Sequence, residues 1–158
     1  MNNKFLKELL SLVLCLSALA VAVPARADQI IMTRVKGEFP EAMNFLQESV
    51  VKQGYKVSRV QRVDVGLTKT GHKTDAYRLV FFGKVDEVRN LSKEFPQLVP
   101  YLPLKIVIFA EGDETLLVAS NPQGLKKSYP QKKLQKYFNA WEKDIRSIMD
   151  KTYTRMLE

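Results

Sequence analysis

An apolar segment near the N-terminus indicates which part of this chain forms the folded protein. Lysines precede the segment, residues 9–23 form its weakly polar to apolar centre, and Ala25 and Ala27 supply the small-x-small pattern that signal peptidases cut. Its fifteen residues are fewer than the roughly 20 that a helix needs to span a bilayer. We therefore expect residues 1–27 to be a secretory signal peptide, cleaved between Ala27 and Asp28 during export to the bacterial periplasm.

The only cysteine of the chain, Cys15, lies inside this signal and leaves with it. Leu14 rather than a small residue precedes Cys15, which argues against a lipid-attachment site. Residues 28–158 hold no cysteine, which excludes disulfides, a thiol nucleophile and a cysteine metal site in that part. A chain of this length buries roughly two thirds of its unfolded surface in one core, so packing alone can hold the domain together.

Basic charge gathers at the C-terminal end of the expected mature protein. Residues 28–124 carry 13 Lys and Arg against 12 Asp and Glu, whereas residues 125–158 carry nine against four. This shift predicts a near-neutral α+β domain at 28–124, followed by a basic, amphipathic C-terminal helix at 125–158.

Alternating apolar and polar residues predict the strands of the domain, and three- and four-residue spacings predict its helices. The alternation slips between Val57 and Val60, which indicates a bulge. Polar residues 66–74 predict a hairpin loop, and three prolines predict an irregular segment at 96–103. We expect strands at residues 29–35, 55–65, 76–82, 104–110 and 115–119, and helices at 40–52 and 86–95.

The order of these elements predicts the fold class. Strand, helix, strand, strand, helix, strand, strand, with short turns between consecutive strands, is typical of an α+β fold. We expect a mixed, mainly antiparallel sheet with the helices on one face. Residues 104–110 are almost wholly apolar, which favours a central strand that is covered on both faces.

The C-terminal segment has an apolar stripe with helical spacing, formed by Leu134, Phe138, Trp141, Ile145 and Ile148. Three hypotheses account for it: the stripe packs on its own domain or a partner subunit, it lies on an anionic membrane surface, or the helix binds an acidic protein or another polyanion. Nucleic acid is not an expected partner of an exported protein whose strands lack interleaved aromatic residues. The candidate surface for an anionic partner consists of Lys126, Lys127, Lys132, Lys133 and Lys136.

Residue types that carry catalysis or metal binding are sparse. His72, the only histidine, lies in the polar loop. A metal site needs several converging ligands, and one histidine without a cysteine supplies too few of them. The acidic stretch 111–114 fits a hairpin turn better than a calcium loop. No glycine-rich phosphate loop and no Gly-x-Ser-x-Gly sequence occurs, so we expect no cofactor and no metal. Acid–base catalysis by carboxylates that meet only in the folded chain stays open.

Two stretches of the C-terminal half resemble a known family. Leu-Pro-Leu-Lys at residues 102–105 opens a strand, and Asn121-Pro122 ends the hairpin that follows. Together with Lys-Gln-Gly-Tyr at residues 52–55 and Phe-Gly at 82–83, they resemble the bacterial domain-of-unknown-function family 302 over most of the mature chain. The resemblance implies a compact α+β domain that pairs as a homodimer, with no established activity and no catalytic residue to carry over.

The chain departs from the family pattern in three places. Residues 84–85 stand where a proline is usual, and residues 125–127 stand where many members carry a histidine. The segment from Gln131 onward looks like an addition to the family domain. From all of this we expect an exported, non-enzymatic binding or structural module. The alternatives are a hydrolase or isomerase that uses carboxylates in a pocket, and a peripheral membrane protein held by its C-terminal helix.

Overall fold

The computed structural model describes residues 29–158, and the expected cleavage site between Ala27 and Asp28 lies outside them. The strands are β1 (Ile30–Lys36), β2 (Lys56–Arg62), β3 (Tyr77–Gly83), β4 (Leu104–Glu111) and β5 (Glu114–Ser120). The helices are α2 (Phe39–Lys52), α3 (Val63–Lys69), α4 (Val85–Glu94) and α5 (Lys132–Arg155), with 3-10 helices η2 (Pro96–Tyr101) and η3 (Pro122–Leu125). None of these helices combines the length and the apolar character of a membrane span.

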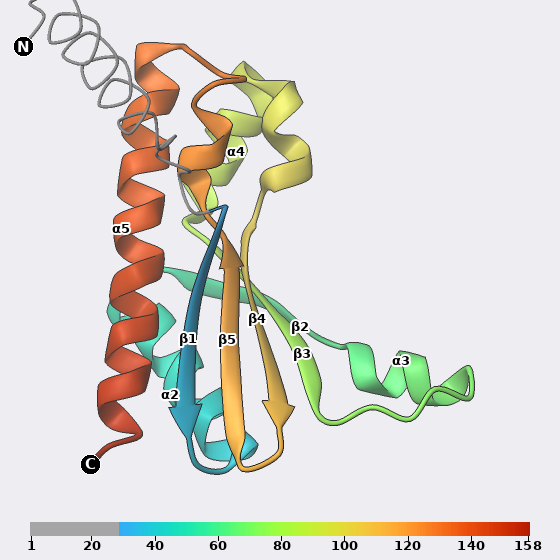
Figure 1. Cartoon of the computed structure of the whole chain (residues 1–158). Helices are drawn as coiled ribbons and strands as arrows, with labels where there is room; N and C mark the ends of the chain where they lie inside the picture. Colours follow the sequence, from blue (N-terminus) through green and yellow to red (C-terminus); the bar gives the residue numbers. More distant parts are fainter. Residues whose placement is uncertain (1–28) are drawn as a thin grey trace, which may run out of the picture.

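The five strands form one sheet in the order β1-β5-β4-β3-β2, and every neighbouring pair is antiparallel (Figure 1). Within residues 29–158 the sheet therefore lacks the parallel part of the mixed sheet that was expected. Helices α2 and α5 pack side by side on one face of it. The predicted α+β fold and the long C-terminal helix are confirmed, and the bulge of β2 lies between Val57 and Arg59.

The core lies between the sheet and helices α2 and α5. Alternate residues of the strands are buried in it, such as Ile106 and Ile108 of β4. The apolar stripe of α5 lies in the same core, where Phe138 and Ile148 are fully buried and Trp141 is 1% exposed. Burying one such side chain stabilises the fold by about 1.5–3 kcal/mol. The C-terminal helix thus packs on its own domain, and residues 29–158 share one core.

The clearest departure from the predicted elements is α3. Val63 and Val65 continue the alternation of the preceding strand, yet this segment is a helix rather than a strand that runs into a polar loop. Asp64 in the first turn of α3 forms an ion pair with Arg78 of β3, which holds the helix against the hairpin. Because the two partners are distant in the chain, no local pattern predicts the contact.

The proline-rich segment is more regular than expected. Pro96 begins the 3-10 helix η2, because the fixed φ of proline suits a first helical turn. The Leu102–Pro103 peptide bond that follows is cis and leads directly into β4. The prediction of an irregular segment was therefore wrong for residues 96–101.

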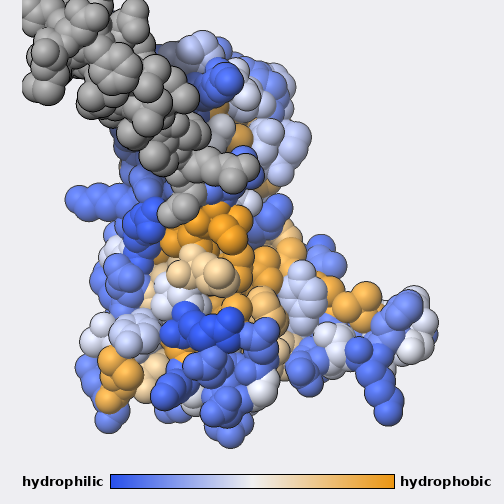
Figure 2. Space-filling model, in the orientation of Figure 1, coloured by the Kyte–Doolittle hydropathy of each residue, from blue (hydrophilic) through white to orange (hydrophobic). Residues whose placement is uncertain are grey.

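One face of the sheet carries no helix within the described part of the chain (Figure 1). Strand β4 is central as predicted, but Val107 and Phe109 point to this uncovered face, so the expected cover on both faces is wrong for the single chain. Figure 2 shows apolar residues gathered on it. We call it the open face, and its apolar residues are Ile30, Met32, Tyr77, Leu79, Phe81, Val107, Phe109, Leu116 and Val118.

Candidate functional site

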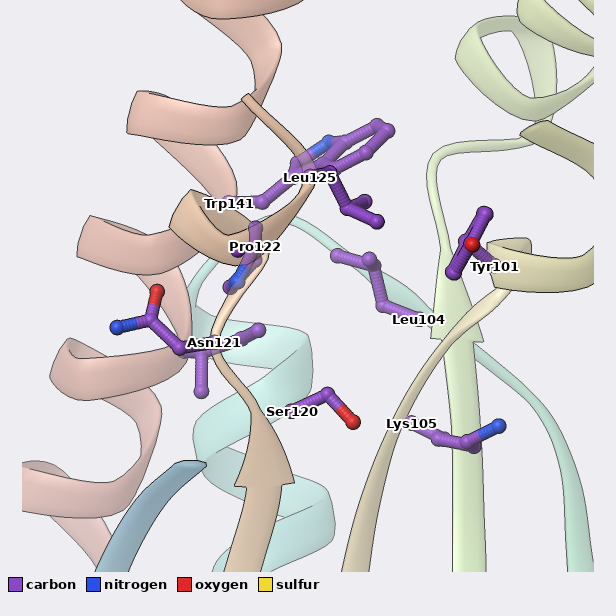
Figure 3. Close-up of a pocket in the computed structure, with 10 residues that line it drawn as sticks. Tyr101, Leu104, Lys105, Ser120, Asn121, Pro122, Leu125 and Trp141 are labelled. Carbon is purple, nitrogen blue, oxygen red and sulfur yellow. The ribbon is translucent and has the colours of Figure 1, made fainter. Parts of the chain in front are cut away.

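Strands β4 and β5 part at one end of the sheet. Their pairing runs from Glu111 and Glu114 beside the hairpin turn up to Val107 and Val118. Beyond that point the first residues of β4 pair with β3 alone, and the last residues of β5 pair with β1 alone. The gap between the strands holds a cavity of about 150 Å³, which we call the end pocket (Figure 3).

Most side chains around the end pocket are apolar. Helix α5 contributes Trp141 and Ile145 to the lining. Leu104 of β4 and Leu125 of η3 lie near each other above the gap between the strands (Figure 3). An apolar wall of this kind favours ligands that carry an apolar body. The residues that line the pocket are Tyr101, Leu104, Lys105, Ser120, Asn121, Pro122, Gly124, Leu125, Trp141 and Ile145.

Trp141 is the only tryptophan of the chain, and its ring is held in place from several sides. Its indole nitrogen donates a hydrogen bond of 2.8 Å to a carboxylate oxygen of Glu87 in α4. The rings of Tyr137 and Phe138 lie 5.8 and 5.7 Å from it between centroids. A ring fixed in this way gives the pocket a rigid wall, which lowers the ordering cost of binding.

The turn after β5 shapes the opposite wall. The side-chain oxygen of Asn121 accepts a hydrogen bond of 3.0 Å from the backbone nitrogen of Gln123, and this cap starts η3. The backbone nitrogen of Asn121 donates to the carbonyl of Gln29 at 2.8 Å. Pro122, at the first position of η3, is buried against the pocket. The Asn-Pro pair thus turns the chain from the sheet to the pocket wall.

Polar groups are found at the mouth of the end pocket. Lys105 and Ser120 are exposed there and belong to the same side of the sheet as the open face. The Lys105 ammonium points away from Ser120 in Figure 3, and its flexible stem can swing across the mouth. Lys105 is the only charged side chain among the ten that line the pocket. The pocket therefore favours a ligand with at most one negative charge.

Tyr101 of η2 stands at the far side of the mouth (Figure 3). Its ring makes an edge contact with Tyr129, 6.1 Å away between centroids, and the Tyr129 hydroxyl donates to the Gln97 carbonyl at 3.2 Å. Partial burial, and then the neighbouring Tyr101 hydroxyl, raise the pKa of Tyr129, so this phenol stays a neutral donor. These contacts fasten η2 to the segment that precedes α5.

The five lysines expected to face an anionic partner lie outside the end pocket. Lys126 and Lys127 follow η3, while Lys132, Lys133 and Lys136 lie at the start of α5. The Lys133 ammonium pairs with Glu94 and stands 5.8 Å from the centre of the Phe95 ring. The five residues thus gather at one end of the domain, and Lys133 already has a partner within it.

The other residues singled out from sequence also lie apart from the pocket. His72 is exposed in the loop after α3, and residues 29–158 contain no group of three His, Cys, Asp or Glu side chains that could hold a metal. Sequence reasoning assigned Trp141 to the core stripe and missed its place in a pocket. The helical spacing of the stripe contains no signal for the pocket, because the gap between the strands creates it.

Comparisons with known proteins identify the family to which this fold belongs. The profile of "Domain of unknown function DUF302" matches residues 31–152. The chain belongs to the DUF302 family. A solved structure of an uncharacterized conserved DUF302 protein from Bacillus stearothermophilus is similar to this one, with 20% sequence identity and a TM-score of 0.71. The match covers 80% of this chain and 99% of that one. No curated protein matches the sequence significantly.

The family match includes most of the C-terminal helix. It extends to residue 152, so most of α5 lies within the family domain, and the expectation of an added segment from Gln131 was wrong. Two of the four motifs that carried the resemblance, Leu-Pro-Leu-Lys at 102–105 and Asn121-Pro122, meet at the end pocket of this DUF302 domain. The first motif leads into β4 and the second follows β5, so the two motifs lie on either side of the gap between these neighbouring strands.

Proposed function

We propose that this DUF302 protein is an exported, non-enzymatic binding module whose end pocket holds a small monocarboxylate with an apolar body. The observation that carries the proposal is the meeting of two of the four family motifs with Trp141 around one apolar pocket. Local packing and turn formation account for each motif separately. Their shared use as pocket walls supports recognition of a ligand.

The size of the end pocket limits the ligand. A cavity of about 150 Å³ lined by apolar side chains is large enough for a benzene-sized molecule, and drug-sized ligands need more. Lys105 at the mouth supplies one positive charge and Ser120 one hydroxyl, which suits a single carboxylate. The ligand class is therefore a monocyclic aromatic or a branched aliphatic acid with few carbon atoms.

Binding without chemistry is the better account of this lining. The ten residues include no Asp, Glu, His or Cys, so the pocket lacks the paired carboxylates that the hydrolase or isomerase alternative requires. Glu87, which contacts Trp141 from α4, is already engaged by the indole nitrogen. A hydrolase or isomerase that uses paired carboxylates would need a different part of the molecule.

The test uses residues 28–158 and the fluorescence of Trp141, titrated with phenylacetate, benzoate and 3-methylbutanoate. We expect a saturable change in emission, and weaker binding of phenylacetamide, which has the same shape without charge. Gly124 lines the pocket and a Cβ there meets no atom within 4 Å, so Gly124→Leu adds a bulky side chain at the pocket wall without a clash. Gly66 in α3 is equally open and lies outside the pocket, which makes Gly66→Leu the matched control.

Three variants test whether the ligand binds in the end pocket. Gly124→Leu should abolish the change in emission, Gly66→Leu should preserve it, and Lys105→Gln should bind phenylacetate and phenylacetamide alike. If none of the three acids gives a saturable change with the wild-type protein, or if both glycine variants titrate alike, the proposal is wrong.

The open face supports a second part of the proposal, that two copies pair through it. Its apolar residues lie on four adjacent strands, β1, β5, β4 and β3, and Ile30 and Met32 are more than half exposed in the single chain. Leu116 is buried, and the other apolar residues of the face are partly exposed. A contiguous apolar patch of this kind marks an interaction site. The apolar sequence of β4 is typical of a strand covered on both faces, and a second copy would supply the missing cover.

Charge placement favours a second copy over an unrelated partner. Lys105 lies at one end of the open face, and Glu111 lies at the other end of the same strand. A two-fold axis across the strands places the Lys105 end of each copy against the Glu111 end of the other, since a symmetric interface uses the same patch twice. Glu111 already pairs with Arg34 of its own chain, so Lys105 stays available to a ligand at the pocket mouth while like charges do not oppose each other across the interface.

A further inference from the structure

A second hollow lies between α2 and α5, away from the end pocket. Its volume is about 570 Å³, and both helices contribute side chains to its walls. No residue is shared with the end pocket. We call it the helix groove, and it is lined by Ser49, Lys52, Lys143, Arg146, Ser147, Asp150, Lys151, Thr154 and Arg155.

The helix groove concentrates positive charge. Five of its nine lining residues are Lys or Arg, and Asp150 is the only acidic one. Lys52 and Arg155 stand in the last turns of α2 and α5, where a cation stabilises the helix dipole. Lys143 and Lys151 lie farther from the helix end, and the Lys151 ammonium donates to the side-chain oxygen of Gln53 at 2.6 Å. Eight residues separate the two lysines, about 12 Å along the helix.

Ser49 gives the groove an unused hydrogen-bond donor. The residue is 2% exposed and lines the groove, yet among residues 29–158 no hydrogen bond of its hydroxyl is present. Thr152 and Thr154 of α5 behave differently, because each hydroxyl donates to a carbonyl one turn earlier, at 2.8 and 3.0 Å. Among residues 29–158 only the Thr115 hydroxyl is both fully buried and unpaired, so water reaches the Ser49 hydroxyl from the groove, and a ligand acceptor can take the place of that water.

The arginines of the groove form half-exposed ion pairs, and the Arg155 guanidinium also stands 4.2 Å from the centre of the Phe45 ring. Arg146 pairs with Glu142 at 3.0 Å, and Arg155 pairs with Glu48 at 2.8 Å. Exposed pairs of this kind contribute little to stability, so an incoming anion can replace either carboxylate. Guanidinium groups match the oxygen geometry of phosphate, and ammonium groups add point charges.

From these observations we infer that the helix groove binds a compound with two phosphate groups, independently of the end pocket. The flexible side chains of Lys143 and Arg146 reach the two linked phosphates from one side of the groove, and those of Lys151 and Arg155 reach them from the other. The Ser49 hydroxyl donates to a phosphate oxygen from the floor of the groove. The same chemistry occurs in soluble bisphosphates and in phosphorylated lipid headgroups.

Isothermal titration calorimetry with inorganic pyrophosphate tests the inference, with inorganic phosphate as the one-group comparison. Loss of a hydrogen bond to a charged group weakens binding by about tenfold or more, which is the effect expected for Ser49→Ala. The double variant Lys143→Gln/Lys151→Gln should weaken pyrophosphate binding at least as much. Lys132→Gln/Lys136→Gln removes the same charge from the start of α5 and should leave the affinity within about twofold.

Binding of pyrophosphate no tighter than that of phosphate, an unchanged affinity of Ser49→Ala, or equal weakening by both lysine double variants would overturn the inference. If Ser49→Ala has an altered circular dichroism spectrum, the two double variants of exposed lysines decide alone. Sedimentation with phosphatidylcholine vesicles, with and without cardiolipin, whose headgroup carries two phosphates, separates a lipid source from a soluble one, since pelleting only with cardiolipin identifies the lipid.

Discussion

The indole nitrogen of Trp141 donates a 2.8 Å hydrogen bond to Glu87, which fastens the middle of α5 to the first turn of α4. The two residues are 54 positions apart in the chain. Glu87 also lies where the N-terminus of α4 favours a negative charge. The same indole lines the end pocket, so the bond sets both the packing of α5 and the position of a pocket wall.

Replacing Glu87 should therefore destabilise the fold. Glu87→Ala leaves a buried indole donor without its charged acceptor, which costs about 1–3 kcal/mol in free energy of unfolding. Urea unfolding followed by Trp141 fluorescence measures the loss. Asp86→Ala removes the same charge from the same helical turn, where Asp86 pairs only with exposed Arg89. The prediction is wrong if the two variants lose equal stability.

Tyr55 should make stability depend on alkaline pH. Its hydroxyl donates to Asp144 at 2.7 Å, and Gln53 donates to the other oxygen of that carboxylate at 2.8 Å. Burial first, and then the Asp144 hydrogen bond, raise the pKa of Tyr55 well above its ordinary value. An unfolded tyrosine ionises near pH 10, so the unfolded chain loses this proton first and stability falls as the pH rises above about 10.

Urea midpoints measured at increasing pH isolate this contribution. Tyr55→Phe should lower stability at neutral pH by about 1–2 kcal/mol, because it removes a hydrogen bond to a charged group. Above about pH 10 the wild-type protein should lose stability more steeply than the variant. Parallel curves for the two proteins would show that Tyr55 titrates alike in the folded and unfolded chains.

Export predicts a defined mature N-terminus. Protein recovered from the periplasm of a Gram-negative host should begin at Asp28 when sequenced from its N-terminus, with the matching intact mass. Ala27→Arg should block processing, because signal peptidase needs a small residue there. Recovery of wild-type protein that begins at Met1 would contradict the proposed export.

Pairing through the open face predicts a dimer in solution that one added charge disrupts. Light scattering after size exclusion should give twice the mass of residues 28–158. Met32 on the open face and Val85 in α4 are both 54% exposed, so lysine at either position can be accommodated by the single chain. Met32→Lys should yield monomers, whereas Val85→Lys should remain dimeric. A monomeric wild type, or a dimeric Met32→Lys variant, would refute this interface.

Local patterns were enough to predict most elements. The three- and four-residue spacing from Leu134 to Ile148 predicted α5, because a helix places such residues on one face. The slip near Val57 predicted the bulge of β2, because the side-chain period of a strand is two. Helix α3 was missed, because the alternation of Val63 and Val65 is too short to distinguish strand from helix and the bond of Asp64 to Arg78 is not local.

Burial of apolar side chains follows from their order along the chain, so fold class, helix faces and a single core could be predicted from the residues alone. The end pocket, the helix groove and the open face could not. Each depends on where separate elements meet or part: β4 and β5 diverge beyond Val107 and Val118, and α2 and α5 bring Ser49 beside Lys143 and Lys151. Hydrophobic periodicity specifies which side of an element is buried, whereas the gaps between elements arise from their packing in three dimensions.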